Sequence, residues 1–279
     1  MTVDRRRPRV HAALLTLLVA FSLLSGSSLA APPSEPPTPG ASSAATDSAL
    51  RSIAAREDSP IARSLPSSTA LDRPMPIGAG TVTVPSQLED GVRFDGADGV
   101  SIRVTPTSSP RSASAEPLAD GGVHYPGPSH ASSVIVSATG VQMLTTIVDA
   151  DAPARYAYDL DLAPGQILEP LGEGIAVKDS DGDIVLTVGA PWALDANGQA
   201  VSTRFEITGS TLTQVVDHSD DSIAYPVVAD PIMLAPWMVK CLVGIGIRGP
   251  DLVRIASMGT PQAILAAFGR GAVACLFGK

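Results

Sequence analysis

Between residues 79 and 230 the sequence consists of short runs of Val, Ile and Thr separated by turn-forming residues, and this pattern restricts the fold more than any other feature. The runs have the length of β-strands, and no segment with helical periodicity interrupts them. We expect strands at residues 81–84, 100–105, 133–137, 142–148, 155–162, 175–178, 184–188, 203–208, 211–216 and 224–228. Short strands without intervening helices are typical of an antiparallel β-sandwich or jelly roll.

Turn residues and side-chain alternation agree with this prediction. The segment 180–183 (SDGD) and the pair Gly209 and Ser210 each separate two expected strands, as hairpin turns do. Within residues 203–208, polar residues alternate with Phe205 and Ile207. Such alternation indicates a strand with one face toward solvent and one face on the core.

The first 30 residues have the three parts of a secretion signal. A basic stretch with four Arg is followed by an apolar run over residues 12–24 and by the small-residue end Ser28-Leu29-Ala30. We expect cleavage after Ala30 and a secreted protein, either free or associated with the cell wall. An uncleaved anchor is disfavoured because the apolar run is shorter than the roughly 20 residues that span a bilayer.

Residues 31–78 are dominated by Pro, Ser, Ala and Thr. A segment of this composition has little apolar surface with which to offset the entropy of ordering, so it predicts a disordered linker. A short helix at residues 45–56 fits the sequence locally. Removal of the whole segment as a propeptide is the alternative.

The net charge differs between the two main parts of the remaining chain. The sequence carries −9, and its first 30 residues hold four Arg and one Asp, which leaves −12 for residues 31–279. Residues 232–279 contain five basic residues and one acidic residue, Asp251, so their net charge is +4. The net charge of residues 31–235 is −16. The basic residues of this tail are Lys240, Arg248, Arg254, Arg270 and Lys279. The acidic balance and the 4% aromatic content make nucleic-acid binding improbable.

The tail at residues 232–279 is expected to be helical. Helices are predicted at residues 236–247, 251–258 and 261–277, with Thr260 as an N-cap and Pro261 at the first helical position of the last one. Its two cysteines, Cys241 and Cys275, are the only ones in the chain, and in an exported protein they predict a disulfide. Two buried thiols are the alternative, and a metal site is disfavoured because no His is nearby.

The last expected helix has a small side chain at every fourth position. The stripe consists of Ala263, Ala267, Gly271 and Cys275. One interpretation is a helical hairpin that packs on itself or on the β-domain; the other is a cationic amphipathic unit that binds anionic membrane surfaces. A transmembrane span is disfavoured because Arg270 interrupts an apolar run that is already short.

Residues with catalytic potential are sparse. His124, His130 and His218 lie in different expected strands or loops, and none has metal-ligand spacing. The Asp179, Asp181 and Asp183 turn is similar to part of a calcium loop but lacks its bidentate Glu, so a plain hairpin turn is favoured. We expect no enzyme activity, no metal and no cofactor; a His that converged with an acidic residue in a pocket would instead indicate a hydrolase.

Four segments carry a resemblance to known proteins: residues 123–127 (VHYPG), 156–162 (YAYDLDL), 190–198 (APWALDANG) and 225–231 (YPVVADP). Together they resemble a β-module of secreted actinobacterial proteins, related to modules of large cell-wall-associated repeat proteins. The resemblance covers residues 90–231 and implies a carrier or presenting domain. It supplies no catalytic residues.

Two functions follow as hypotheses, and both place a β-sandwich at residues 79–231. In the first, a secreted, non-enzymatic protein carries a cationic helical tail that is released near a flexible junction at Asp230 and Pro231. The tail then acts on anionic membranes, as a bacteriocin-like peptide or interbacterial effector does. In the second, a cell-wall or surface-associated module binds a glycan or a protein, and its tail is purely structural. Trp192, Tyr125, Tyr156 and Tyr158 are the aromatic candidates for such binding, although core packing explains each of them better.

Overall fold

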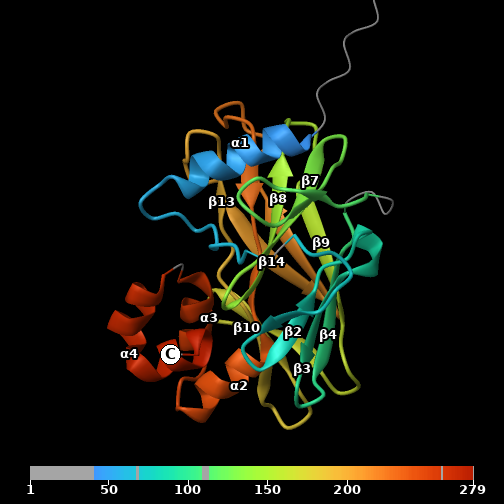
Figure 1. Cartoon of the computed structure of the whole chain (residues 1–279). Coiled ribbons are helices and arrows are strands. Elements are labelled where there is room, and N and C mark those ends of the chain that lie inside the picture. The colour runs from blue at the N-terminus through green and yellow to red at the C-terminus, as the bar shows by residue number, and fades with distance from the viewer. Residues whose placement is uncertain (1–40, 67–68, 109–112, 259, 279) are drawn as a thin grey trace, which may run out of the picture. The chain divides into compact units, whose positions relative to one another are not determined.

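The computed structural model describes residues 41–66, 69–108, 113–258 and 260–278. They form an antiparallel β-sandwich with helices, so the predicted fold class is confirmed (Figure 1). The secretion signal with its cleavage position at Ala30, residues 31–40 and Lys279 lie outside the described residues.

The first sheet has seven strands, and every pairing in it is antiparallel. Its order is β1 (Met75–Ile77), β2 (Gly80–Thr83), β3 (Val92–Gly96), β4 (Ser101–Pro106), β9 (Arg155–Asp161), β15 (Thr211–Val216) and β14 (Thr203–Thr208). A short 3-10 helix, η1 (Leu88–Asp90), connects β2 to β3. The strands β1 and β14 are the two edges of this sheet.

The second sheet packs against the first and has a branched path. Its order is β10 (Ile167–Leu171), β11 (Gly174–Lys178), β12 (Ile184–Val188), β17 (Ile232–Leu234), β8 (Gly140–Ile147), β7 (His130–Val136), β6 (Val123–Tyr125) and β5 (Glu116–Pro117). The strand β16 (Val227–Ala229) also pairs with β8 and with β13 (Ala193–Leu194). Inward side chains of both sheets, such as Phe94, Tyr158 and Met143, form one buried core.

Every expected strand is present, with ends that differ by a few residues. The strands that the sequence did not predict are short or carry residues that disfavour sheets. For example, β3 contains Asp95 and Gly96, and β1, β5 and β10 each contain a proline. Pairing with neighbouring strands overrides these local preferences.

The segment predicted as a disordered linker is folded in its described part, residues 41–66 and 69–78, and the short helix expected at residues 45–56 is present. Helix α1 (Ser43–Ala54) begins at the N-cap Ser42, whose side chain accepts a hydrogen bond from the Ala45 amide at 3.3 Å. Its buried face packs on the outer surface of the second sheet, in a cluster of Ala49, Leu50, Ile53, Leu118, Ile135, Leu144 and Val228. The low apolar content of the segment favoured a disordered linker, but an apolar face at helical spacing is sufficient for docking.

The domain boundary predicted at residue 231 is also wrong by several residues. Residues 232–234 form β17, which pairs with both β8 and β12 inside the second sheet. Three helices follow: α2 (Pro236–Gly244), α3 (Pro250–Ser257) and α4 (Pro261–Phe277). They lie together at one end of the sandwich, in red in Figure 1. None of the helices in the described residues is both long and apolar enough to cross a bilayer.

Candidate functional site

The helices α2, α3 and α4, here called the helical cap (residues 236–258 and 260–278), begin where proline permits a helix to start. Pro236, Pro250 and Pro261 each occupy the first turn, where a missing amide proton costs nothing. Thr260 caps α4 and accepts a hydrogen bond from the Ala263 amide at 3.3 Å. The predicted helices of the tail are therefore present, with small shifts at their ends.

Helix α2 is anchored in the core of the sandwich. Trp237, Met238, Val239 and Leu242 are all buried. The Trp237 ring covers Gly80 on β2, and a Cβ atom at residue 80 would lie 2.3 Å from Trp237 Cε3. This close approach joins the cap to the first sheet by packing that only a residue without a side chain permits.

A disulfide connects the first and last helices of the cap. The sulfurs of Cys241 and Cys275 are 2.03 Å apart, and their Cα atoms are 5.6 Å apart. Beyond this bond, α4 buries only three residues, Ile264, Ala272 and Leu276. Most of its surface is consequently directed outward.

The small-residue stripe predicted on α4 does not form one continuous face. Gly269 has φ 79° and ψ −176°, which breaks the helix into two parts between Ala267 and Gly271. Ala263, Ala267 and Gly271 are exposed, and Cys275 is engaged in the disulfide. A Cβ at Gly271 would lie 3.2 Å from Ile245 Cδ1, so the second part of α4 lies beside the α2–α3 turn.

The cap exposes several apolar side chains. Ile245 is 49% exposed and Leu265 is 45% exposed, and together with Ile167 they are the exposed large hydrophobic residues of the described chain. Ala263, Ala266, Ala267 and Ala274 of α4 are also exposed. We call these six residues, Ile245, Ala263, Leu265, Ala266, Ala267 and Ala274, the apolar cap surface.

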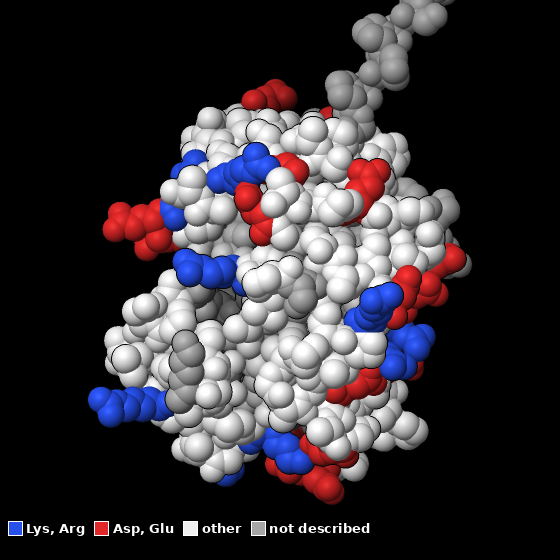
Figure 2. Space-filling view, viewed as in Figure 1, with Lys and Arg blue, Asp and Glu red and all other residues white. Residues whose placement is uncertain are grey.

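Basic side chains accompany this surface, and only some of them have acidic partners. Lys240 Nζ lies 2.7 Å from Asp98 Oδ2 on the β3–β4 turn, and its hydrogen bond lowers the pKa of Asp98. Arg254 lies 3.6 Å from Asp251 and covers the Phe268 ring at 5.3 Å. Arg248 and Arg270 form no ion pair with any described residue. Figure 2 shows this side of the cap as a nearly uncharged surface with basic atoms at its margin.

The three histidines are packed into separate parts of the sandwich. His124 Nε2 lies 3.1 Å from the Ala41 carbonyl oxygen, which ties the chain before α1 to β6. His218 lies between the Tyr225 hydroxyl at 2.9 Å and the Pro153 carbonyl at 3.1 Å. His130 packs against Tyr156 with ring centroids 5.1 Å apart. Burial disfavours the charged form of both rings, so it lowers the pKa of His124 and of His130.

The acidic turn after β11 is a hairpin turn, as favoured from the sequence. The Asp179 carboxylate accepts hydrogen bonds from the amides of Asp181 and Asp183 at 3.0 and 2.9 Å. Across the described residues, no group of three or more His, Cys, Asp or Glu side chains is placed to hold a metal ion.

The aromatic candidates for ligand binding belong mainly to the core. Tyr125, Tyr156 and Tyr158 are buried, and the Tyr125 hydroxyl donates to the Pro85 carbonyl oxygen at 2.5 Å. Trp192 is partly buried against the cluster that contains α1. These side chains stabilise the sandwich and leave no aromatic platform among the three tyrosines.

A buried carboxyl group was missed by the sequence analysis. Asp230, from the YPVVADP segment, accepts hydrogen bonds from the Trp192 amide at 3.3 Å and from Gln142 Nε2 at 3.4 Å. Gln142 also binds the backbone of Pro60 and Ala62, at 3.0 and 2.7 Å. Burial raises the pKa of Asp230 to about 8. This cluster fixes the chain after α1 to the second sheet.

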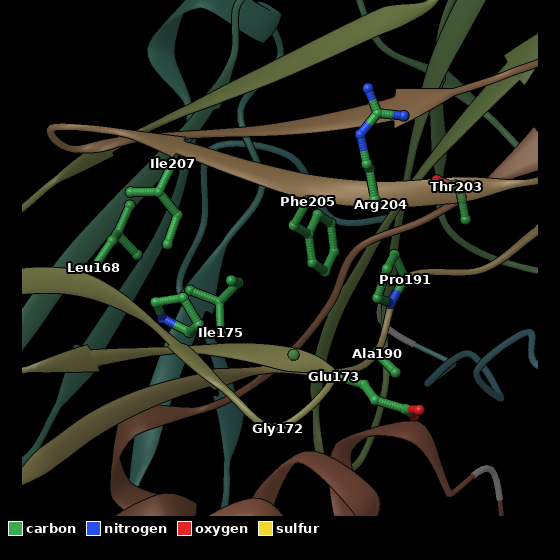
Figure 3. A pocket seen from close by; sticks show the side chains of 12 residues that line it. Leu168, Gly172, Glu173, Ile175, Ala190, Pro191, Thr203, Arg204, Phe205 and Ile207 are labelled. Carbon is green, nitrogen blue, oxygen red and sulfur yellow. The ribbon is translucent and has the colours of Figure 1, made fainter.

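A groove of about 800 Å³ lies between edge strands of the two sheets. Figure 3 shows Phe205 and Ile207 extending from β14 toward Leu168 of β10 and Ile175 of β11, whereas the Arg204 guanidinium points away from the space. Glu173 stands at its margin, and the neighbouring Gly172 lies near Pro250 at the start of α3. The lining of the groove is polar and apolar in nearly equal parts, and the described residues that line it include no His or Cys.

Comparison with known proteins adds no functional assignment. No protein-family model matches the chain. No curated protein is significantly similar to it. The chemistry of the cap and of the groove is therefore the basis for inference.

Proposed function

We propose that the protein is secreted, has no enzymatic activity, and attaches to anionic membrane surfaces through its helical cap. The observation that carries this proposal is the apolar cap surface, which includes two large exposed side chains, Ile245 and Leu265. Arg248 and Arg270 lie on the same cap without acidic partners among the described residues. Apolar area and positive charge together are what drive a helix to lie in the membrane interface.

The disulfide and the anchored helix α2 support binding by a preformed surface. Because the Cys241–Cys275 bond holds α4 against α2, the cap loses little conformational entropy when it binds. Each basic residue near an anionic bilayer contributes about 1 kcal/mol, and salt weakens this contribution. The rest of the protein is acidic, so the cap is the part that is suited to face the membrane.

Attachment by the intact chain fits the fold better than release of the tail. Asp230 and Pro231 are buried, and β17 directly after them pairs with two strands. Cleavage there would require β17 to leave the sheet and Trp237 to leave the core. We therefore assign the membrane-binding role to the cap in place, and treat membrane leakage by a released peptide as a separate outcome to be measured.

Vesicle co-sedimentation tests the proposal with residues 31–279. The protein should sediment with vesicles of phosphatidylglycerol and phosphatidylcholine, and not with phosphatidylcholine alone. The double variant Ile245→Glu/Leu265→Glu should lose binding, and Arg248→Gln/Arg270→Gln should weaken it. Ile167→Glu is the matched control, because Ile167 is also exposed, at 54%, but lies on β10 outside the cap.

Equal binding by the wild type and the Ile245→Glu/Leu265→Glu variant would refute the proposal, as would absence of binding to the anionic vesicles at low salt. Dye release in the same assay separates disruption of the bilayer, as a bacteriocin-like effector would cause, from simple attachment.

The second candidate is a cell-wall or surface-associated binding module. It is favoured by the burial of Trp237, which gives α2 a structural role, and by the open groove beside Phe205. Sedimentation with purified cell walls tests it. This function would be favoured over membrane attachment if Phe205→Ala reduced retention on the walls and the cap variants left it unchanged.

A further inference from the structure

Four strands form the edges of the two sheets, and they differ in how well they block addition of another strand. An edge strand exposes unpaired backbone groups, and proline or a short strand blocks addition of another strand there. The edge strands β1, β5 and β10 each contain a proline: Pro76, Pro117 and Pro170. On the side branch, β13 has only two residues. The remaining edge strand, β14, has six residues and no proline.

The hydrogen-bond pattern shows which backbone groups of β14 face outward. The Asp217 amide donates to the Ser202 carbonyl at 2.9 Å, and β14 pairs with β15 in regular register from Thr203 to Thr208. Because antiparallel pairs alternate, even-numbered residues direct their N–H and C=O groups to β15. The amides and carbonyls of Thr203, Phe205 and Ile207 therefore point to the side on which β14 has no neighbouring strand among the described residues.

We propose that β14 pairs with β14 of a second copy of this chain, in antiparallel register about Phe205. In this register Phe205 faces Phe205 of the other copy, and Thr203 faces Ile207. All three are the residues whose backbone groups face outward, so the two strands can exchange hydrogen bonds along their whole length. The first sheets of the two copies then form one continuous sheet.

Charge complementarity selects this register among those that the backbone permits. With Phe205 at the centre, Arg204 of each copy lies opposite Glu206 of the other copy, which gives two symmetric ion pairs. If the strand of one copy is shifted by two residues in one direction, Arg204 lies opposite Arg204 of the other copy. If it is shifted by two residues in the other direction, Glu206 lies opposite Glu206 of the other copy. Like charges directly opposite each other are destabilising, so the shifted registers are disfavoured.

The positions of these side chains agree with the pairing. Arg204 and Glu206 lie on the outer face of the sheet, where Arg204 Nη2 is 3.1 Å from Glu206 Oε1 within the copy. The Arg204 guanidinium points away from the groove in Figure 3, whereas Phe205 borders it. The groove leaves open space beside β14 on its inner side, so Phe205 of the second copy can pack there.

Sedimentation velocity on residues 31–279 at concentrations up to about 100 µM measures the association, a range that resolves dimers of modest affinity. We expect a monomer–dimer equilibrium for the wild type. Arg204→Glu and Glu206→Arg each place like charges opposite each other, so each should weaken self-association about tenfold or more. An equimolar mixture of the two variants should dimerise again, because positions 204 and 206 are then both acidic in one copy and both basic in the other.

Phe205→Pro is the second variant, and Phe205→Ala is its reference, because both lose the Phe205 ring that packs against the core and only the first loses the amide proton. That proton is one that β15 does not use, so the two variants should have similar thermal unfolding midpoints, and Phe205→Pro should associate more weakly than Phe205→Ala. Ser52→Ala, on an exposed position of α1, is the matched control and should dimerise as the wild type does. A wild type that stays monomeric throughout this range, or a dimer that both charge variants and Phe205→Pro leave intact, would overturn the proposal.

Discussion

Gly80 and Trp237 are in direct contact across the boundary between the sandwich and the helical cap. A Cβ atom at residue 80 would lie 2.3 Å from one carbon of the indole ring and 2.4 Å from another. The ring cannot move freely, because Trp237 is buried beside Met238 and Val239. The cap is therefore part of the same cooperative core as β2 and β3.

The first prediction concerns this contact. Gly80→Ala should lower the free energy of unfolding by about 1 to 3 kcal/mol, because the added methyl group overpacks the site. Urea unfolding followed by tryptophan fluorescence measures the change. Gly244→Ala is the control, since a Cβ at this helical position meets nothing within 4 Å, and it should be neutral or slightly stabilising. Equal effects of the two substitutions would contradict the packing described for Trp237.

The second prediction concerns the disulfide. Cys241 and Cys275 are 34 residues apart in the sequence, and closing a loop of this length restricts the unfolded chain by about 3 to 4 kcal/mol in the chain-entropy model. Cys241→Ser/Cys275→Ser should destabilise the protein by up to that amount, measured by denaturant unfolding. Dithiothreitol should shift the wild type toward the variant and leave the variant unchanged. An identical unfolding curve for both proteins would mean that the bond does not constrain the unfolded chain.

The strands were predictable because burial imposes a pattern that the sequence must carry. Buried and exposed residues mostly alternate along β9, whereas β7 and β8 are buried along their whole length. Residues 203–208 and 211–216 were located to the residue, since the Gly209-Ser210 turn and the alternation around Phe205 fix both ends. The disulfide was predictable because the chain offers only one pairing. The strand at Ile232–Leu234 was not, because three residues that lie just before a proline-initiated helix carry no periodicity.

The site was less predictable than the fold, because it depends on contacts between distant residues. The kink at Gly269, which divides the small-residue stripe, has no local signal beyond the glycine itself. The burial of Asp230 beside Gln142 joins residues 88 positions apart. The YPVVADP segment was noticed as a motif, but sequence alone offered no reason for its carboxyl group to lie inside the protein.

The third prediction concerns the ionisation of Asp230. Burial raises the pKa of its carboxyl group to about 8, well above its value in an unfolded chain. Between about pH 4 and pH 8 the unfolded state therefore holds fewer protons at this group than the folded state, so its contribution favours folding at low pH and is lost as the pH rises. The stability of the wild type relative to Asp230→Asn should fall by up to roughly 1 kcal/mol per pH unit across this interval.

Parallel urea titrations of both proteins from about pH 4.5 to about pH 8, an interval chosen to lie between the two pKa values, measure this difference. Asn keeps the size of the side chain and does not ionise, so other carboxylates cancel in the comparison. A constant offset between the two proteins at every pH would mean that Asp230 ionises normally in the fold.

The last prediction concerns helix α1, which rests on the outer face of the second sheet in its own cluster. Leu50 is buried against this cluster, separate from the main core, so its loss should affect α1 more than the whole fold. Leu50→Ala should remove about 2 kcal/mol or more of docking free energy, the usual cost of shortening a buried Leu. Trypsin should then cleave after Arg51 and Arg56 faster than in the wild type, while the unfolding midpoint of the sandwich changes little.

Ser52→Ala serves as the control for helix propensity, because Ser52 lies on the exposed side of the same helix and should leave cleavage unchanged or slower. If Leu50→Ala lowered the global midpoint as much as Gly80→Ala does, α1 would unfold together with the sandwich. The hydrogen bonds of Gln142 to Pro60 and Ala62 would then be the connection, since they join the chain after α1 to the sheet that carries Asp230.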